Sequence, residues 1–139
     1  MRPGNRPKAA ARGRSAADRI LEKLRDLCVS LPGVSEVEAW GHPNFRVGKK
    51  TFAVFEYYRG RPCIAVKAED GLQQILVDEI RFFRTPYLGN RGWVSAWVDR
   101  HVDWTLMKDL VKRSFSLMAP KGPLKLIPRG ARSGRGQRG

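Results

Sequence analysis

The sequence predicts an α+β fold, an antiparallel sheet of four strands or slightly more with the N- and C-terminal helices packed on one face. Three observations lead to this prediction. Amphipathic helical patterns stand near both ends of the central region, β-rich runs separated by short turns lie between them, and 139 residues suffice for one core. Hairpin-linked strands flanked by helices are typical of this two-layer architecture.

The first helix is predicted to begin after Ser15 and to end at the Leu31-Pro32-Gly33 segment. Ser15 stands three residues before Asp18, a spacing that favours an N-cap. Apolar residues then recur at helical intervals and give the helix one core-facing side: Ile20, Leu21, Leu24, Leu27, Cys28 and Leu31. After the helix we expect a polar approach from Val34 to a turn at residues 40–43.

The strands are expected in four β-rich segments, at residues 44–47, 51–58, 63–67 and 93–98. The first two form a hairpin around Gly48-Lys49-Lys50, and the third follows the Arg59-Gly60-Arg61-Pro62 turn. Before the fourth strand, residues 72–80 are predicted to form a short helix and residues 82–92 a loop. The glycines of that loop are expected at positive φ, where a side chain is unfavourable.

The last helix is predicted to begin at Asp103, a suitable N-cap, and to stop at Pro120. Its apolar face carries residues with the spacing of an amphipathic helix: Met107, Leu110, Val111, Ser114 and Met118.

Basic residues are concentrated at the two ends of the chain. Residues 1–15 hold five Lys or Arg and residues 120–139 hold six, with no acidic residue in either, so these ends account for eleven of the fourteen net positive charges. We therefore expect disordered basic tails at 1–15 and 120–139 around a single domain at 16–119. Such tails either hold a polyanion or simply increase solubility, and the sequence leaves both readings open.

Several classes of function lack support in the sequence. The two cysteines and the absence of a secretory or membrane-spanning apolar run make the cytoplasm the default location, without a membrane partner. Cys28, His42, Cys63 and His101 do not stand at the spacing of metal ligands, so no metal or cofactor is expected. No nucleophile stands beside a base, and we expect no enzyme.

Strand order yields one inference about a binding site. In an antiparallel meander the third strand ends where the second begins, so the excursion 68–92 leaves and re-enters the sheet at that end. This arrangement places Lys67, Arg84 and Arg91 near Lys49 and Lys50. Basic groups of such a rim would hold phosphates. Aromatic residues between them would stack on unpaired bases or form a small satellite core, and the candidates for support are Phe83, Tyr87 and Trp93.

The segment from Arg19 to about Lys121 resembles the MmcQ/YjbR family of small bacterial proteins. The resemblance is carried by short motifs in the expected order: Leu31-Pro32-Gly33-Val34, Gly48-Lys49-Lys50-Thr51-Phe52-Ala53, Phe82-Phe83-Arg84-Thr85-Pro86-Tyr87-Leu88-Gly89, Arg91-Gly92-Trp93-Val94, Asp103-Trp104, Ser114 and Lys121. It implies a CyaY-like fold, related in architecture to frataxin, and a "double wing" DNA-binding function. By carry-over, the wings would be the hairpin around Lys49 and the loop from Arg84 to Arg91.

The leading hypothesis is therefore a non-enzymatic, monomeric DNA-binding protein that uses the basic rim of Lys49, Lys50, Lys67, Arg84 and Arg91 together with its cationic tails. The alternative is a domain that binds a protein or a small ligand through an aromatic sheet face, without specificity for nucleic acid. Trp93, Ser95 and Trp97 share one side of the fourth strand and motivate this alternative, because two tryptophans there require a cover or a partner.

Overall fold

The structure is a computed structural model, and it describes residues 15–120. Both predicted tails lie outside these residues, apart from Ser15 and Pro120. The chain forms, in order, α2 (Ala16–Val29), β1 (Val34–Ala39), β2 (His42–Val47), β3 (Lys50–Tyr58), β4 (Arg61–Lys67), α3 (Leu72–Leu76), β5 (Phe82–Arg84), the 3₁₀ helix η1 (Gly89–Arg91), β6 (Trp93–Trp97) and α4 (Trp104–Met118).

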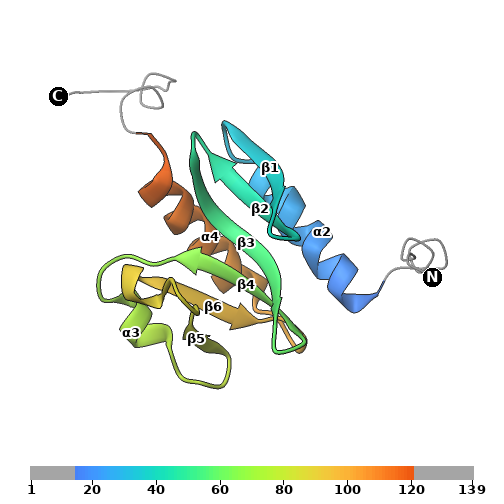
Figure 1. Ribbon diagram of the computed structural model, residues 1–139, viewed down its shortest axis with the longest axis vertical. Coiled ribbons are helices and arrows are strands. Elements are labelled where there is room, and N and C mark those ends of the chain that lie inside the picture. Colours follow the sequence, from blue (N-terminus) through green and yellow to red (C-terminus); the bar gives the residue numbers. More distant parts are fainter. Residues whose placement is uncertain (1–14, 121–139) are drawn as a thin grey trace.

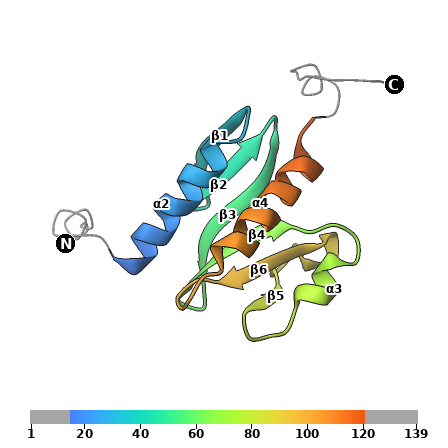
Figure 2. The same cartoon turned by 180° about the vertical axis from the view of Figure 1, so that it is seen from behind.

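The strands make one antiparallel sheet in the order β1-β2-β3-β4-β6-β5 (Figure 1). The two long helices, α2 and α4, lie together on one face of this sheet, and within residues 15–120 the opposite face carries no helix of comparable length (Figures 1 and 2). The predicted α+β class and the one-sided placement of the terminal helices are thus confirmed. The sheet has six strands, two more than the minimum of four that was expected.

Two of these strands were missed by the sequence prediction. β1 was expected to be a polar approach, because most of its residues are polar or exposed and show no alternation. β5 has three residues and lies inside the segment predicted as a loop. Conversely, the helix predicted at 72–80 ends at Leu76, and its expected apolar positions Ile75 and Ile80 are 79% and 76% exposed.

Both predicted N-caps are present. The Ser15 hydroxyl accepts a hydrogen bond from the Asp18 amide at 3.0 Å, and the Asp18 carboxylate accepts one from the Ser15 amide at 3.3 Å, which completes a capping box. At α4, the Asp103 carboxylate accepts from the Leu106 amide at 3.1 Å. The helices bury their apolar faces against the sheet, and the core contains residues from both layers: Leu24, Cys28, Phe45, Phe55, Ile64, Val94, Met107, Leu110 and Val111.

The hydroxyl of Ser114 holds the sheet at the point where β3 and β4 diverge. The last pair between these strands is Ala53 with Val66, and the next pair would be Phe52 with Lys67. Instead, the fully buried Ser114 hydroxyl donates to the Phe52 carbonyl at 2.6 Å and accepts from the Lys67 amide at 3.0 Å. A helix side chain therefore satisfies two backbone groups that the separation of the strands leaves unpaired.

The excursion between β4 and β6 is fixed by the buried side chain of Gln73. Its amide nitrogen donates to the carbonyls of Gly89 at 2.8 Å and Trp93 at 2.7 Å, and its oxygen accepts from the Arg84 guanidinium at 3.1 Å. The expectation of positive φ is confirmed at Gly92, with φ +87°, and is wrong at Gly89. Gly89 has little room for a side chain, since a Cβ there would lie 3.1 Å from the Cβ of Arg84.

We predict that Ser114→Ala lowers the free energy of unfolding by about 2–3 kcal/mol, because it leaves a buried carbonyl and a buried amide without partners. Urea denaturation of the two proteins measures this difference. Ser116→Ala is the matched control, since Ser116 is exposed on the same helix and its replacement is expected to change stability by less than about 0.5 kcal/mol. Equal effects at the two serines would contradict the proposed role of the Ser114 hydroxyl.

A second prediction concerns Asp78, whose carboxylate accepts backbone hydrogen bonds from Phe82, Ile80 and Arg81 at 2.9–3.0 Å. These bonds lower the pKa of Asp78 from 3.8 to about 2. A depressed folded-state pKa stabilises the fold above the unfolded pKa, and this contribution is lost as pH falls through the folded one. Asp78→Asn should therefore lower the melting temperature at pH 7, and its difference from the parent should shrink between about pH 4 and pH 2.

The control for that experiment is Asp70→Asn, which removes an exposed carboxylate from the same excursion. It should leave the acid side of the stability curve unchanged. A difference at Asp78 that stayed constant down to the lowest pH would rule out the ionised carboxylate as its source.

Candidate functional site

A groove of about 1130 Å³ crosses the face of the sheet opposite the long helices. We call it the sheet groove. Its floor comes from β2, β3, β4 and β6, its walls come from the β1–β2 turn and from the segment from the loop after β5 to η1, and Met118 at the end of α4 also lines it. It lies over the divergence of β3 and β4. The lining residues Thr51 and Lys67 therefore belong to strands that no longer pair with each other at that level.

Two aromatic side chains flank the sheet groove and are almost completely exposed. Trp40, in the β1–β2 turn, is 94% exposed, and Tyr87, in the loop after β5, is 98% exposed. Both have positive φ, 58° for Trp40 and 68° for Tyr87, a conformation that bulky residues rarely adopt. Strain of this kind together with solvent-exposed rings is typical of a binding site.

Three of the five predicted basic residues line the sheet groove: Lys50, Lys67 and Arg91. Antiparallel pairing of Lys67 with Trp93 brings the end of β4 beside the start of β6, as the strand order predicted. The ammonium group of Lys67 donates a hydrogen bond to the Arg91 carbonyl, which ties the strand to the loop.

The other two predicted basic residues lie elsewhere. Arg84 lines a neighbouring polar cleft of about 530 Å³, in which Lys67 and Arg91 also take part, and its guanidinium is engaged by Gln73. Lys49 is exposed in the β2–β3 turn and lines none of the described cavities. Strand order does not fix the directions of the side chains in residues 68–92. Contacts within that segment turn Arg84 away from the sheet groove.

The three predicted aromatic residues have different environments. Trp93 is buried in the floor of the sheet groove, whereas Tyr87 stands exposed on its wall. Phe83 is buried in a cluster of three rings, with its centroid 4.3 Å from that of Trp97 and 5.5 Å from that of Tyr58, which themselves lie 6.2 Å apart. The satellite-core interpretation therefore holds for Phe83 and fails for Tyr87.

The Phe83 stack also covers Trp97, one of the two tryptophans that the sequence left without a cover. The Arg61 guanidinium lies 4.0 Å from the centre of the Trp97 ring and forms an ion pair of 2.6 Å with Asp99. Trp97 is therefore covered by residues of the same chain and needs no partner. Trp40 and Tyr87, on the walls of the sheet groove, remain almost fully exposed.

Sequence reasoning missed Glu56, whose carboxylate lies among the lining residues of the sheet groove. Burial raises the pKa of Glu56, and the nearby His42 partly opposes this shift. Within residues 15–120, no hydrogen bond or ion pair to this carboxylate is found. The available signal was the occurrence of one acidic residue in the otherwise apolar and aromatic run from Phe52 to Tyr58.

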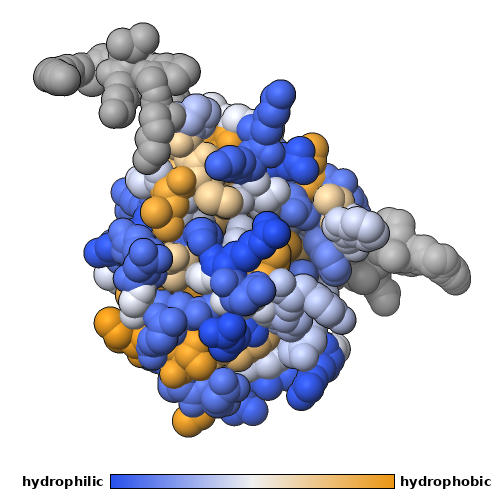
Figure 3. All heavy atoms as spheres, turned by 60° about the vertical axis from the view of Figure 1, so that its left-hand side comes forward, coloured by the Kyte–Doolittle hydropathy of each residue, from blue (hydrophilic) through white to orange (hydrophobic). Residues whose placement is uncertain are grey.

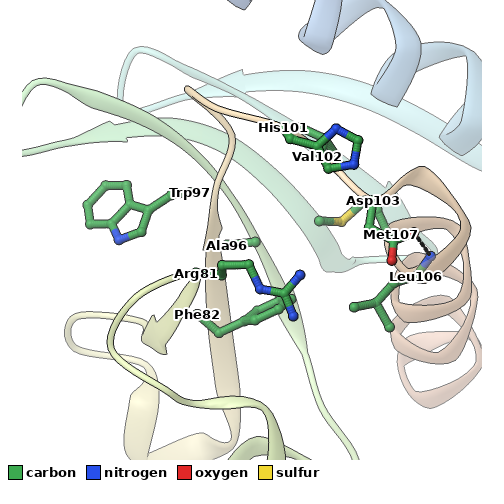
Figure 4. A pocket seen from close by; sticks show the side chains of 9 residues that line it. All are labelled: Arg81, Phe82, Ala96, Trp97, His101, Val102, Asp103, Leu106 and Met107. Atoms are coloured by element: carbon green, nitrogen blue, oxygen red, sulfur yellow. Dashed lines mark hydrogen bonds between the residues drawn. The ribbon is translucent and has the colours of Figure 1, made fainter.

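A second, much smaller cavity of about 20 Å³ lies between β6 and the start of α4 (Figure 4). His101 is exposed at its edge, and the Asp103 carboxylate is already used as the cap of α4. A space of this size holds about one water molecule. We therefore assign no ligand to it.

The described part of the chain holds no group of three His, Cys, Asp or Glu side chains that could bind a metal ion. Both cysteines are buried, and burial raises the pKa values of Cys28 and Cys63 to about 12, so neither thiol is poised as a nucleophile. None of the helices within residues 15–120 is long and apolar enough to cross a membrane.

A family model described as YjbR matches residues 29–117. The chain belongs to the YjbR family. The predicted resemblance is thereby confirmed, and the matched segment of this YjbR-family chain contains all six strands and hence the floor of the sheet groove. None of the curated proteins compared with the chain matches it.

Two solved structures share the fold of this YjbR-family chain. A Deinococcus radiodurans protein, DR2400, described as a DUF419 domain, has a TM-score of 0.64 at 21% identity and covers 73% of this chain and 80% of its own. A Pseudomonas syringae protein has a TM-score of 0.60 at 13% identity and covers 70% of this chain and 97% of its own. Similarity at this level of identity shows the fold alone.

The conformation of Trp40 yields a prediction about stability. Trp40→Asn should raise the free energy of unfolding by about 1 kcal/mol, because Asn-Gly is favoured where both turn residues have positive φ. Removal of the tryptophan ring should cost little, since the ring is exposed and buries little apolar surface. Trp40→Phe, which keeps an aromatic residue at the same φ, is the control and should bring no gain. A loss of stability in Trp40→Asn, measured by urea denaturation, would show that the ring stabilises the fold.

Proposed function

We propose that this protein binds single-stranded DNA in the sheet groove and catalyses no reaction there. One observation carries the proposal: two almost fully exposed aromatic rings, Trp40 and Tyr87, flank a groove that Lys50, Lys67 and Arg91 also line. Cationic side chains track the phosphates of a single strand, and aromatic rings stack on its unpaired bases.

The arrangement of layers supports the same choice. An antiparallel sheet with both long helices on one face leaves the other face available, and sheet faces of this kind serve as stacking platforms for single strands in other folds. Hydrophilic side chains also gather across the middle of the side of the molecule where β4 ends and β6 begins, with hydrophobic patches above and below them (Figure 3). Polar and apolar groups interleaved in this way suit a ligand with charged phosphates and flat bases.

Unpaired rather than duplex DNA follows from the chemistry of the rings. A base inside a duplex has both faces covered by its neighbours, so Trp40 and Tyr87 can stack only on bases that are unstacked. The two wings implied by the family resemblance correspond here to the β2–β3 turn and the loop after β5. In this proposal the loop after β5 forms one wall of the sheet groove, and Lys50, which follows the β2–β3 turn, lines it. The basic tails, outside the described residues, would add salt-dependent affinity without reading sequence.

A second candidate is the binding of a small ligand or a protein segment in the same groove. It is favoured by the apolar floor at Val54 and Trp93 and by a volume just above that of many small-molecule sites, which reach about 1000 Å³. The line of cations is not required by this alternative. Binding of oligonucleotides therefore distinguishes the two candidates.

The test is a titration of the full chain against a labelled thymidine oligonucleotide of about twelve nucleotides and against a duplex of equal length, at several salt concentrations. We expect the single strand to bind more tightly than the duplex. Trp40→Ala and Tyr87→Ala should each weaken its binding by about tenfold. A double variant with Lys50→Gln and Lys67→Gln should reduce the slope of log K against log salt by about 0.7 for each lysine.

The matched control is Ile75→Ala, which truncates an exposed apolar side chain on α3 away from the sheet groove and should leave binding unchanged. Tighter binding of the duplex would contradict the proposal. Binding that persists undiminished in all the groove variants would assign the affinity to the tails, and the groove would then have no part in it.

A further inference from the structure

Glu56 is the one acidic side chain among the lining residues of the sheet groove, and His42 acts on it through charge without a hydrogen bond. β3 carries it on the open face, where the pairing of Asn44 with Val54 puts His42 beside it on β2. No hydrogen bond or ion pair to its carboxylate is found within residues 15–120. A half-buried carboxylate in this state is costly unless a ligand supplies hydrogen-bond donors.

Its neighbour Asn44 is held in a fixed orientation. The side-chain amide of Asn44 donates to the backbone carbonyls of His42, at 3.0 Å, and Ala39, at 3.4 Å. Both donor hydrogens are therefore used inside the protein, and the Asn44 amide does not donate to Glu56. Since burial also raises the pKa of Glu56, a ligand that donates to the ionised carboxylate gains by relieving its desolvation.

We propose that Glu56 selects guanine among unpaired bases, its two carboxylate oxygens accepting hydrogen bonds from the N1–H and N2–H groups of the base. This inference rests on the proposed binding of single-stranded DNA. Guanine is the only one of the four DNA bases that presents two adjacent donors on its Watson–Crick edge. Adenine and cytosine each offer one amino donor beside an acceptor, and thymine offers one donor between two acceptors, which a carboxylate would repel.

In this proposal, stacking on the bases and selection among them take place in different parts of the sheet groove. Trp40 and Tyr87 stand on its walls and stack on any base, because every base has a π-face. Glu56, in the floor, meets only the edge of a base that enters the groove. Loss of Glu56 is thus expected to change the choice of base, because the rings on the walls do not discriminate between bases.

The experiment measures binding of thymidine oligonucleotides that carry one central guanine, adenine, cytosine or hypoxanthine. The guanine oligonucleotide should bind about tenfold more tightly than those with adenine or cytosine, as one good bidentate contact provides. Hypoxanthine keeps N1–H but lacks the N2 amino group, so its affinity should lie between them. Glu56→Gln should abolish the preference for guanine, because an amide presents a donor to one of the two guanine donors.

Glu38→Gln is the matched control, since it removes the same charge from an exposed position on β1 and should preserve the preference for guanine. Urea denaturation of Glu56→Gln verifies that the variant is folded. Equal affinity for the four oligonucleotides, or a preference that survives Glu56→Gln, overturns the inference while the proposed function stands. Absence of binding to every oligonucleotide overturns the proposed function and this inference together.

Discussion

The Ser114 hydroxyl donates one hydrogen bond and accepts another, and these two bonds determine where the sheet opens. β3 and β4 can part beyond Ala53 and Val66 only because α4 supplies one group that donates to the Phe52 carbonyl and accepts from the Lys67 amide. Unpaired backbone groups at that depth would otherwise close the sheet or destabilise it. The helix layer thereby shapes the opposite face, and the space that becomes the sheet groove depends on a contact made behind it.

The walls of the sheet groove depend on a second buried polar group, Gln73. Its three hydrogen bonds join α3, β5 and the segment around η1, so the loop that carries Tyr87 is attached to the sheet at both ends. Trp40 needs no such anchor, since a two-residue turn between paired strands already fixes its position. Two rings from distant parts of the sequence are thus presented over one floor without being packed into it.

Those features that local sequence decides were predictable, and those that depend on tertiary partners were not. The caps at Ser15 and Asp103 follow from the residues beside them, and strand polarity alone placed Lys67 and Arg91 at the same end as Lys50. The orientation of Arg84 away from the sheet groove was not predicted, because the direction of its side chain is set by Gln73, eleven residues away. β1 was missed because its polar residues do not alternate with apolar ones. Glu56 was missed because a carboxylate without a hydrogen-bond partner is recognised only once its surroundings are known.

The polar character of β1 has a consequence for how copies of the protein meet. β1 ends the sheet on one side with an unpaired edge, and such edges recruit further strands when they are long, flat and apolar. Here the edge carries Glu38 and Glu36, and the latter is clamped by Arg25 of α2 at 2.7 Å. At the other side, β5 offers only three residues. The same residues that concealed an edge strand from prediction thus protect the sheet against strand-by-strand aggregation.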